Sequence, residues 1–179
     1  IASYHRLHPE VNLQMTEIEN DAVERALSND TADIVFTRLF AKSTLNVESC
    51  VSETDEFYVV LPKSSPLANQ TTLEAADLAD SDLLLLGEYT YQPIQQLFNE
   101  TGITPKITYK GQRIDLILGM ISRGFGLSIM MKKTVDLTDY PDLTAIKLTP
   151  TVSSQLAFLR KTGTHSHASD SFWTFIQQK

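Results

Sequence analysis

The chain has 179 residues, of which 42% are hydrophobic, and its 15 basic and 22 acidic residues give a formal net charge of −7. This composition is typical of a globular protein, and the negative charge opposes binding of these residues to a nucleic-acid backbone. No run approaches the roughly 20 apolar residues of a membrane-spanning helix, and the single cysteine excludes an internal disulfide.

The first part of the chain alternates between predicted helices and strands. Apolar residues at helical spacing predict a helix over 1–7, and a chain that starts inside a helix indicates a piece of a longer protein. Alternating apolar and polar residues predict a strand over 11–16 with one buried face. A helix follows from Glu17 to the break at Asn29, and a buried strand over 32–36 ends at Thr37 and Arg38.

Further elements follow in the same order of helix, turn and strand. The polar stretch 63–72, rich in serine, proline and asparagine, is a candidate boundary between two lobes. The predicted strands are 47–51, 56–61, 82–86, 106–109, 143–148 and 155–160. The predicted helices lie near 74–78, from Pro93 to Gly102, and around the aromatic stripe of Phe172 and Phe175.

The stretch 113–131 is the most informative part of the chain. Ile114, Ile117, Leu118 and Ile121 recur at the spacing of one apolar helix face. Gly124 suits a left-handed helix terminus, and the almost wholly apolar run 127–131 predicts a strand covered on both sides. This is half of a parallel α/β unit, and we expect small molecules to bind at its corner.

No catalytic, metal-binding or cofactor motif is found. The pair of glycines around Phe125 lacks the third glycine and the preceding strand of a dinucleotide site. The histidines at 5, 8, 165 and 167 lack a nearby cysteine or carboxylate cluster, so surface positions are expected rather than metal ligands. The acidic residues of 53–56 are expected at a solvated strand edge. We therefore predict no enzyme activity and no cofactor.

Polar residues gather instead at predicted strand ends and helix starts. Helix N-termini offer free backbone N–H groups to anions, and arginine offers a planar fork to carboxylates. Several such residues at one end of two sheets predict a ligand cleft, with Arg38 binding a small anion or, alternatively, pairing with a nearby acidic side chain. The predicted site consists of Thr16, Glu17, Thr37, Arg38, Gly87, Glu88, Tyr89, Thr90, Gln112, Arg113, Gly124 and Phe125.

The order of these residues resembles the effector-binding domain of LysR-type transcriptional regulators. The similar passages are His8–Glu17, Ala32–Arg38, Glu56–Ala68, Ile117–Met131 and Ser171–Ile176. The sequence departs from the family pattern at Ser65, where histidine is usual, and at Met130-Met131, where Leu-Pro often ends the strand.

The resemblance implies the type II periplasmic-binding-protein fold, an α/β fold with two Rossmann-like lobes and an interlobe cleft. Lobe I would be residues 1–62 and 149–179, and lobe II residues 63–148. It further implies a small-molecule effector, homodimers or homotetramers, a bacterial cytoplasmic location, and DNA binding only through an N-terminal domain absent from this chain. The rival hypotheses are a solute-binding protein of a transporter and an enzyme built on the same fold.

Overall fold

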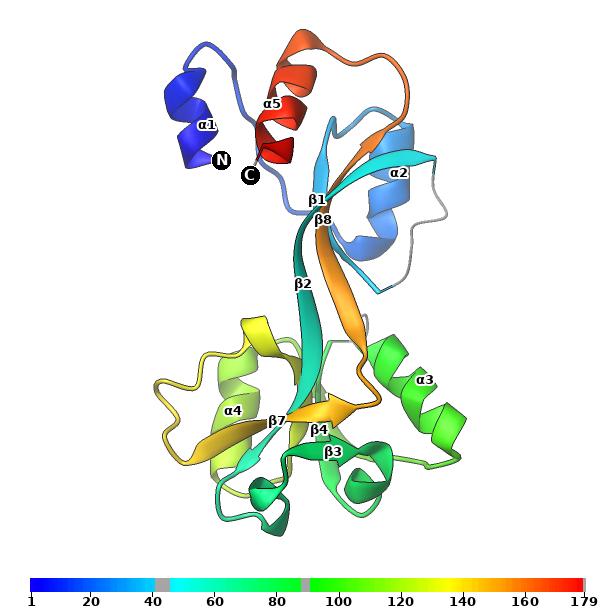
Figure 1. Cartoon of the computed structure of the whole chain (residues 1–179), viewed down its shortest axis with the longest axis vertical. Coiled ribbons are helices and arrows are strands. Elements are labelled where there is room, and N and C mark those ends of the chain that lie inside the picture. The colour runs from blue at the N-terminus through cyan, green and yellow to red at the C-terminus, as the bar shows by residue number, and fades with distance from the viewer. Residues whose placement is uncertain (41–45, 88–90, 179) are drawn as a thin grey trace. The chain divides into compact units, whose positions relative to one another are not determined.

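The computed structural model describes residues 1–40, 46–87 and 91–178, and the chain divides into two compact units (Figure 1). Unit 1 comprises Ile1–Thr54 and Gln155–Lys179, and unit 2 comprises Asp55–Ser154. The chain crosses between them within two strands, β2 (Val47–Pro62) and β8 (Ser153–Lys161). The lobe limits near 62 and 148 that the resemblance implied stay a prediction.

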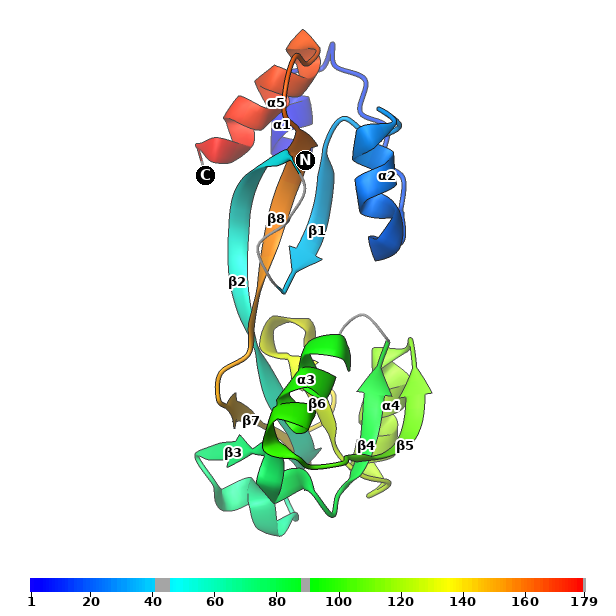
Figure 2. The same ribbon diagram turned by 90° about the vertical axis from the view of Figure 1, so that its right-hand side faces the viewer.

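Unit 1 is a small sheet with helices on both faces (Figure 2). β1 pairs antiparallel with β8, and β8 is followed in the sheet by β2. In Figure 2, α2 lies on one side of β1 and β8, and α5 and α1 lie on the other. The remaining elements of this unit are α1 (Ala2–Leu7), η1 (Asn20–Ala22), α2 (Val23–Ser28), β1 (Val35–Leu39) and α5 (His167–Gln177).

Two separate groups of side chains hold these layers together. On the α2 face, Val35 and Leu39 of β1 pack with Val23 and Leu27. On the α5 face the contacts are largely aromatic: Tyr4 is fully buried, and its ring lies 4.9 Å from that of Phe172 and 5.3 Å from that of Phe175. The alternation of side chains along β1 therefore separates an aliphatic layer from an aromatic layer.

Unit 2 is a mixed sheet with α3 (Tyr91–Thr101) and α4 (Ile114–Ser122) on opposite faces (Figure 1). β4 and β5 are parallel, while β6 and β7 pair antiparallel with β2, and β3 is parallel to β7. The strands and 3₁₀ helices are η2 (Pro66–Asn69), β3 (Thr72–Glu74), η3 (Ala75–Leu78), β4 (Asp82–Leu86), β5 (Lys106–Gly111), β6 (Ser128–Met131), η4 (Lys132–Thr134) and β7 (Leu143–Thr149).

β4 and β6 lie side by side, although β4 pairs along its length with β5 and β6 pairs with β2. A parallel bridge joins Leu83 to Leu127, and backbone hydrogen bonds of 2.9 Å run from Leu84 N to Leu127 O and from Leu127 N to Asp82 O. α4 covers this junction, because Ile117, Leu118 and Ile121 pack against Leu84, Met130 and Val60. The predicted α4 face and the buried strand after it are confirmed.

Three predictions about elements are wrong. Residues 11–16 form no strand, because an alternating pattern needs a paired strand and a covering layer, and Met15 is 73% exposed. The helix expected from Glu17 begins only at η1. The two strands expected at 47–51 and 56–61 form one continuous strand, β2.

Candidate functional site

One edge of the unit 2 sheet gathers several of the predicted site residues. β4 and β5 are parallel and Leu86 is paired with Gly111, so the chain leaves both strands at the same edge. Gly87 has a positive φ of 65° and donates its N–H to the Gly111 carbonyl at 2.8 Å. Gln112 and Arg113 follow Gly111 directly. The structure thus brings together Gly87, Gln112 and Arg113, whereas Glu88, Tyr89 and Thr90 lie outside the described residues.

Two helices begin at this edge, α3 at Tyr91 and α4 at Ile114. The first N–H groups of an α-helix have no partner within the helix, and the helix dipole adds positive potential there. α4 receives no side-chain cap from its N-cap residue Arg113. Lys110 adds a cation, with its Nζ 5.0 Å from the centre of the Tyr91 ring. This edge therefore suits a small anion.

Arg113 is held by the carboxylate of Asp115. Its Nε donates to Asp115 Oδ1 at 3.2 Å, and its Nη2 donates to Oδ2. These hydrogen bonds raise the pKa of Arg113 and lower the pKa of Asp115. Both side chains are more than 60% exposed, so solvent screens the pair strongly, and an anionic ligand can compete for the guanidinium.

Asp55 lies at the same edge, which sequence reasoning missed. Phe57 of β2 pairs with Met131 of β6, so the segment before Phe57 meets the start of η4. The Asp55 carboxylate is 3% exposed and accepts the Lys133 N–H at 3.2 and 3.3 Å. The expectation of a solvated acidic cluster is wrong for Asp55, because the pattern around 53–56 does not reveal which backbone group a carboxylate will meet.

The other predicted residues of unit 1 lie near the carboxyl end of β1. Thr37 donates its hydroxyl to Asn20 Oδ1 at 3.0 Å, which joins β1 to the start of η1. Thr16 and Glu17 are exposed residues of the segment before η1. Arg38 lies within β1 rather than after it, opposite Leu156 of β8. Because neighbouring strand residues point to opposite faces, Arg38 and Thr37 do not share a face.

Gly124 and Phe125 lie at the opposite end of the unit 2 sheet from Gly87. They precede Gly126 and Leu127, which contact Asp82 and Leu83 at the start of β4. This corner does not share an end with Gly87, because a helix-to-strand turn lies at the amino end of its strand, whereas ligands of open α/β sheets bind at the carboxyl ends. A role of Gly124 and Phe125 in ligand binding stays a prediction.

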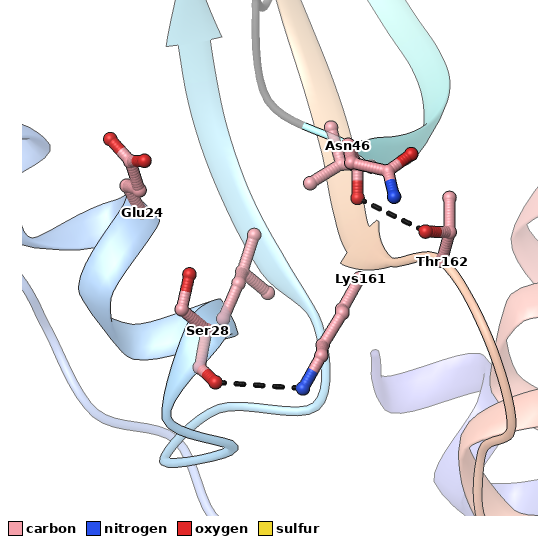
Figure 3. Close-up of a pocket in the computed structure, with 7 residues that line it drawn as sticks. Glu24, Ser28, Asn46, Lys161 and Thr162 are labelled. Atoms are coloured by element: carbon pink, nitrogen blue, oxygen red, sulfur yellow. Dashed lines mark hydrogen bonds between the residues drawn. The ribbon is translucent and has the colours of Figure 1, made fainter.

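A pocket of about 410 Å³ lies elsewhere in unit 1, between α2, the start of β2 and the end of β8 (Figure 3). Lys161 Nζ donates to the Ser28 carbonyl at 3.5 Å and to Asp30 at 3.2 Å. Thr162 donates its hydroxyl to the Asn46 carbonyl at 3.3 Å. None of the predicted site residues lines this pocket.

Neither a metal site nor a membrane span is found in the described parts of the chain. Within 1–40, 46–87 and 91–178, no three histidine, cysteine or acidic side chains gather as ligands of one ion. No helix in the same ranges combines the length and the hydropathy needed to cross a bilayer.

The comparison with protein families decides what kind of domain this is. The family described as the LysR substrate binding domain matches residues 1–179, the whole chain. The chain belongs to this family. A LysR substrate-binding domain binds a small-molecule effector and has the type II periplasmic-binding-protein-like fold, so the predicted family and α/β fold are confirmed. The transporter alternative is not favoured.

Individual relatives agree with this assignment. GltC, a transcriptional dual regulator of Bacillus subtilis, is 21% identical over 136 residues, which are 75% of this LysR domain and 45% of that protein. The effector-binding domain of QuiR in complex with shikimate aligns with a TM-score of 0.79 and 20% identity, over 99% of this chain and 86% of that chain. The BenM effector-binding domain with its effector benzoate aligns with a TM-score of 0.77 and 22% identity, over 99% of this chain and 82% of that chain. The chain spans less than half the length of its curated relatives.

Proposed function

We propose that this chain is the regulatory part of a bacterial transcription regulator that contacts DNA through a segment outside the chain. The family match over the whole chain carries this proposal. GltC, a transcriptional regulator of which the match covers 45%, supports it. The net charge of −7 opposes contact of this chain with the DNA backbone, and this supports DNA binding by another segment. On this proposal the chain is not an enzyme and works in the cytoplasm.

The proposed effector is a small anion with a carboxylate or phosphate group. The N-termini of α3 and α4, where the helix dipole adds positive potential, support this choice. Arg38 and Arg113 each supply a guanidinium fork for a carboxylate or a phosphate. Shikimate and benzoate, bound by QuiR and BenM, are both carboxylates. The residues proposed to bind the effector are Thr16, Glu17, Thr37, Arg38, Gly87, Glu88, Tyr89, Thr90, Gln112 and Arg113.

The effector is proposed to act by shifting the population of two arrangements of the domain. Such a shift transmits a signal only when the effector binds one arrangement better than the other. We propose that the two arrangements differ at β2 and β8, the two strands that cross between the units. Binding within an interlobe cleft stays a prediction.

Identification of the effector tests the proposal. The purified chain is denatured, and the compounds it releases are identified by mass spectrometry. We expect a carboxylate or phosphate metabolite that stabilises the protein when it is added back, by about 2.7 kcal/mol at a hundredfold excess over Kd. A released compound without negative charge, or an anion that leaves the melting temperature unchanged, would count against the proposal.

We also propose that the protein forms a homodimer or homotetramer. Large apolar side chains on helices support this: Ile1 and Leu7 at α1 are 58% and 66% exposed, and Leu116 on α4 is 45% exposed. Sedimentation equilibrium at micromolar concentration should show the oligomer. A longer chain with the natural upstream segment is the control, and monomers of both chains would contradict the proposal.

A further inference from the structure

We infer that the hydroxyl group of Tyr109 donates a hydrogen bond to the anion that Arg113 binds, which makes Tyr109 a further specificity-determining residue of the site. The inference rests on the proposed function, because Arg113 is one of the proposed effector-binding residues. It deepens that proposal by adding a neutral donor beside the charged guanidinium. The residues that carry the inference all belong to unit 2.

The ring of Tyr109 lies along β5 toward the carboxyl end of that strand. Tyr109 and Gly111 are two positions apart on β5, so they face the same side of the sheet. A Cβ built on Gly111 would lie 2.5 Å from the Tyr109 hydroxyl oxygen, and 2.6 and 2.8 Å from the ring atoms Cε1 and Cζ. The hydroxyl end of the ring therefore covers the Gly111 backbone, at the point where the chain leaves β5 for Gln112 and Arg113.

The apolar part of the Tyr109 ring is held by packing, which fixes the position of the hydroxyl. Tyr109 is half-buried and, like Ile114 at the start of α4, packs against the core group that contains Leu84, Ile117 and Leu118. A tyrosine in such a place presents its apolar body to the core and its polar tip to the rim. A side chain that is already held in this way loses little conformational freedom when it binds a ligand.

The Tyr109 hydroxyl is available to a ligand and lies within electrostatic reach of Arg113. In the part of the chain that the structure describes, this hydroxyl has no hydrogen-bond partner. A buried tyrosine hydroxyl usually has one, and an oxygen of the ligand would supply it. The pKa of Arg113 is raised first by its hydrogen bond to Asp115, and the charge of Tyr109 adds to the shift. The two side chains therefore lie near enough for one small anion to contact both.

The two donors differ in kind, and this difference sets what each contributes to binding. The Arg113 guanidinium is charged and offers a planar fork to the oxygens of a carboxylate or a phosphate. The Tyr109 hydroxyl is neutral and donates a single hydrogen bond from a position that the ring fixes. Hydrogen bonds to charged groups are stronger than those between neutral groups. We therefore expect Tyr109 to favour an ionised oxygen over the carbonyl or hydroxyl group of a neutral compound.

Titration with inorganic phosphate at constant pH and ionic strength, followed by the amide NMR signals of Gln112 and Arg113, tests the inference. Tyr109→Phe removes only the hydroxyl and keeps the ring in the core. Tyr140→Phe is the matched control, because Tyr140 packs against the same core group and its hydroxyl donates to the Asp115 carbonyl at 3.1 Å. We expect Tyr109→Phe to weaken phosphate binding about tenfold at an unchanged melting temperature. Tyr140→Phe should lower the melting temperature and leave the phosphate affinity unchanged.

A second substitution tests the position of the hydroxyl by a different route. Gly111 is not among the residues with positive φ, so its backbone accepts alanine. The added methyl group would press against the Tyr109 hydroxyl and move the ring. We expect Gly111→Ala to weaken phosphate binding in the natural chain but to add little to the loss in Tyr109→Phe, because the displaced hydroxyl is already absent there. An undiminished second loss would show that the methyl group acts on another contact and would overturn the inference.

The remaining outcomes separate this inference from the proposed function. If Arg113→Ala weakens phosphate binding and Tyr109→Phe does not, the proposed anion site stands and the role of Tyr109 falls. If the chain binds no phosphate, or if neither variant changes its binding, the result overturns the inference and counts against the anion site as well. A lowered melting temperature of Tyr109→Phe with unchanged affinity would assign the hydroxyl to the fold. Equal losses of affinity in Tyr109→Phe and Tyr140→Phe would also overturn the inference.

Discussion

The corner between α4 and β6 contains two glycines whose replacement by alanine should have very different costs. Gly124 has a φ of 77°, and an added Cβ would meet no atom within 4 Å. Gly126 has a φ of 146°, and its Cβ would collide with the carbonyl oxygen of Asp82. The same oxygen accepts the Leu127 N–H that holds β6 beside β4. Gly126 is therefore required by close approach as well as by backbone conformation.

These contacts give an expected magnitude for each substitution. Gly124→Ala places an L-residue in the left-handed region, which costs about 1–2 kcal/mol of the free energy of unfolding. Gly126→Ala carries a backbone strain of about 1–3 kcal/mol. It also displaces the two hydrogen bonds of the Leu127 bridge, each worth about 1 kcal/mol. We expect Gly126→Ala to cost roughly 3–5 kcal/mol in total, and clearly more than Gly124→Ala.

Urea unfolding of the two variants followed by far-UV circular dichroism measures the difference. Tryptophan fluorescence is unsuitable, because Trp173 is the only tryptophan and belongs to unit 1, whereas the corner lies in unit 2. Insoluble Gly126→Ala beside soluble Gly124→Ala would agree with the expectation. Equal losses for both variants, or a loss below about 1 kcal/mol for Gly126→Ala, would refute the assigned close approach.

Three further predictions concern arginines. Arg38→Ala should weaken binding of the true effector by about 2–4 kcal/mol, about 30- to 1,000-fold, with an almost unchanged melting temperature. Arg38→Lys should recover only part of the lost affinity. Calorimetry that shows unaltered affinity would assign Arg38 to structure. Arg113→Ala should raise the pKa of Asp115 back toward its ordinary 3.8. The ion pair of Arg113 with Asp115 stabilises the fold above that pH and is lost as pH falls through the lowered pKa, so an NMR titration with no change in Asp115 would contradict the pairing. Arg160→Ala should cost about 3 kcal/mol in urea unfolding, because Arg160 is 8% exposed and donates to Glu48 and Asp170 at 2.7 Å; a loss below about 1 kcal/mol would show that solvent screens the pair.

Local sequence patterns predicted those elements whose characteristic residues lie close together in the sequence. The apolar face of α4, the terminating Gly124 and the apolar run of β6 are all short-range features, and the structure confirms them. The alternation over residues 11–16 failed because a strand depends on a partner that a local pattern does not reveal. The order of motifs along the chain, rather than any single motif, predicted the family.

The candidate site was harder to predict because it depends on the directions of side chains and on contacts between residues far apart in the sequence. Thr37 and Arg38 are neighbours in sequence but point to opposite faces of β1. The bridge from Leu83 to Leu127 places Gly124 at the opposite end of the sheet from Gly87, and this pairing depends on residues far apart in the sequence. Asp55 meets Lys133, which is 78 residues away in the chain, and no local pattern predicts that contact.

The central claim is the proposal that this LysR domain binds a small anionic effector through the residues named above for that role. Its most direct test is a map of backbone amide chemical shifts during titration with the compound released from the purified protein. The account predicts that the largest changes fall on residues 16–20, 37–38, 87 and 112–113. Changes centred on the pocket of Ser28 and Lys161 would contradict it.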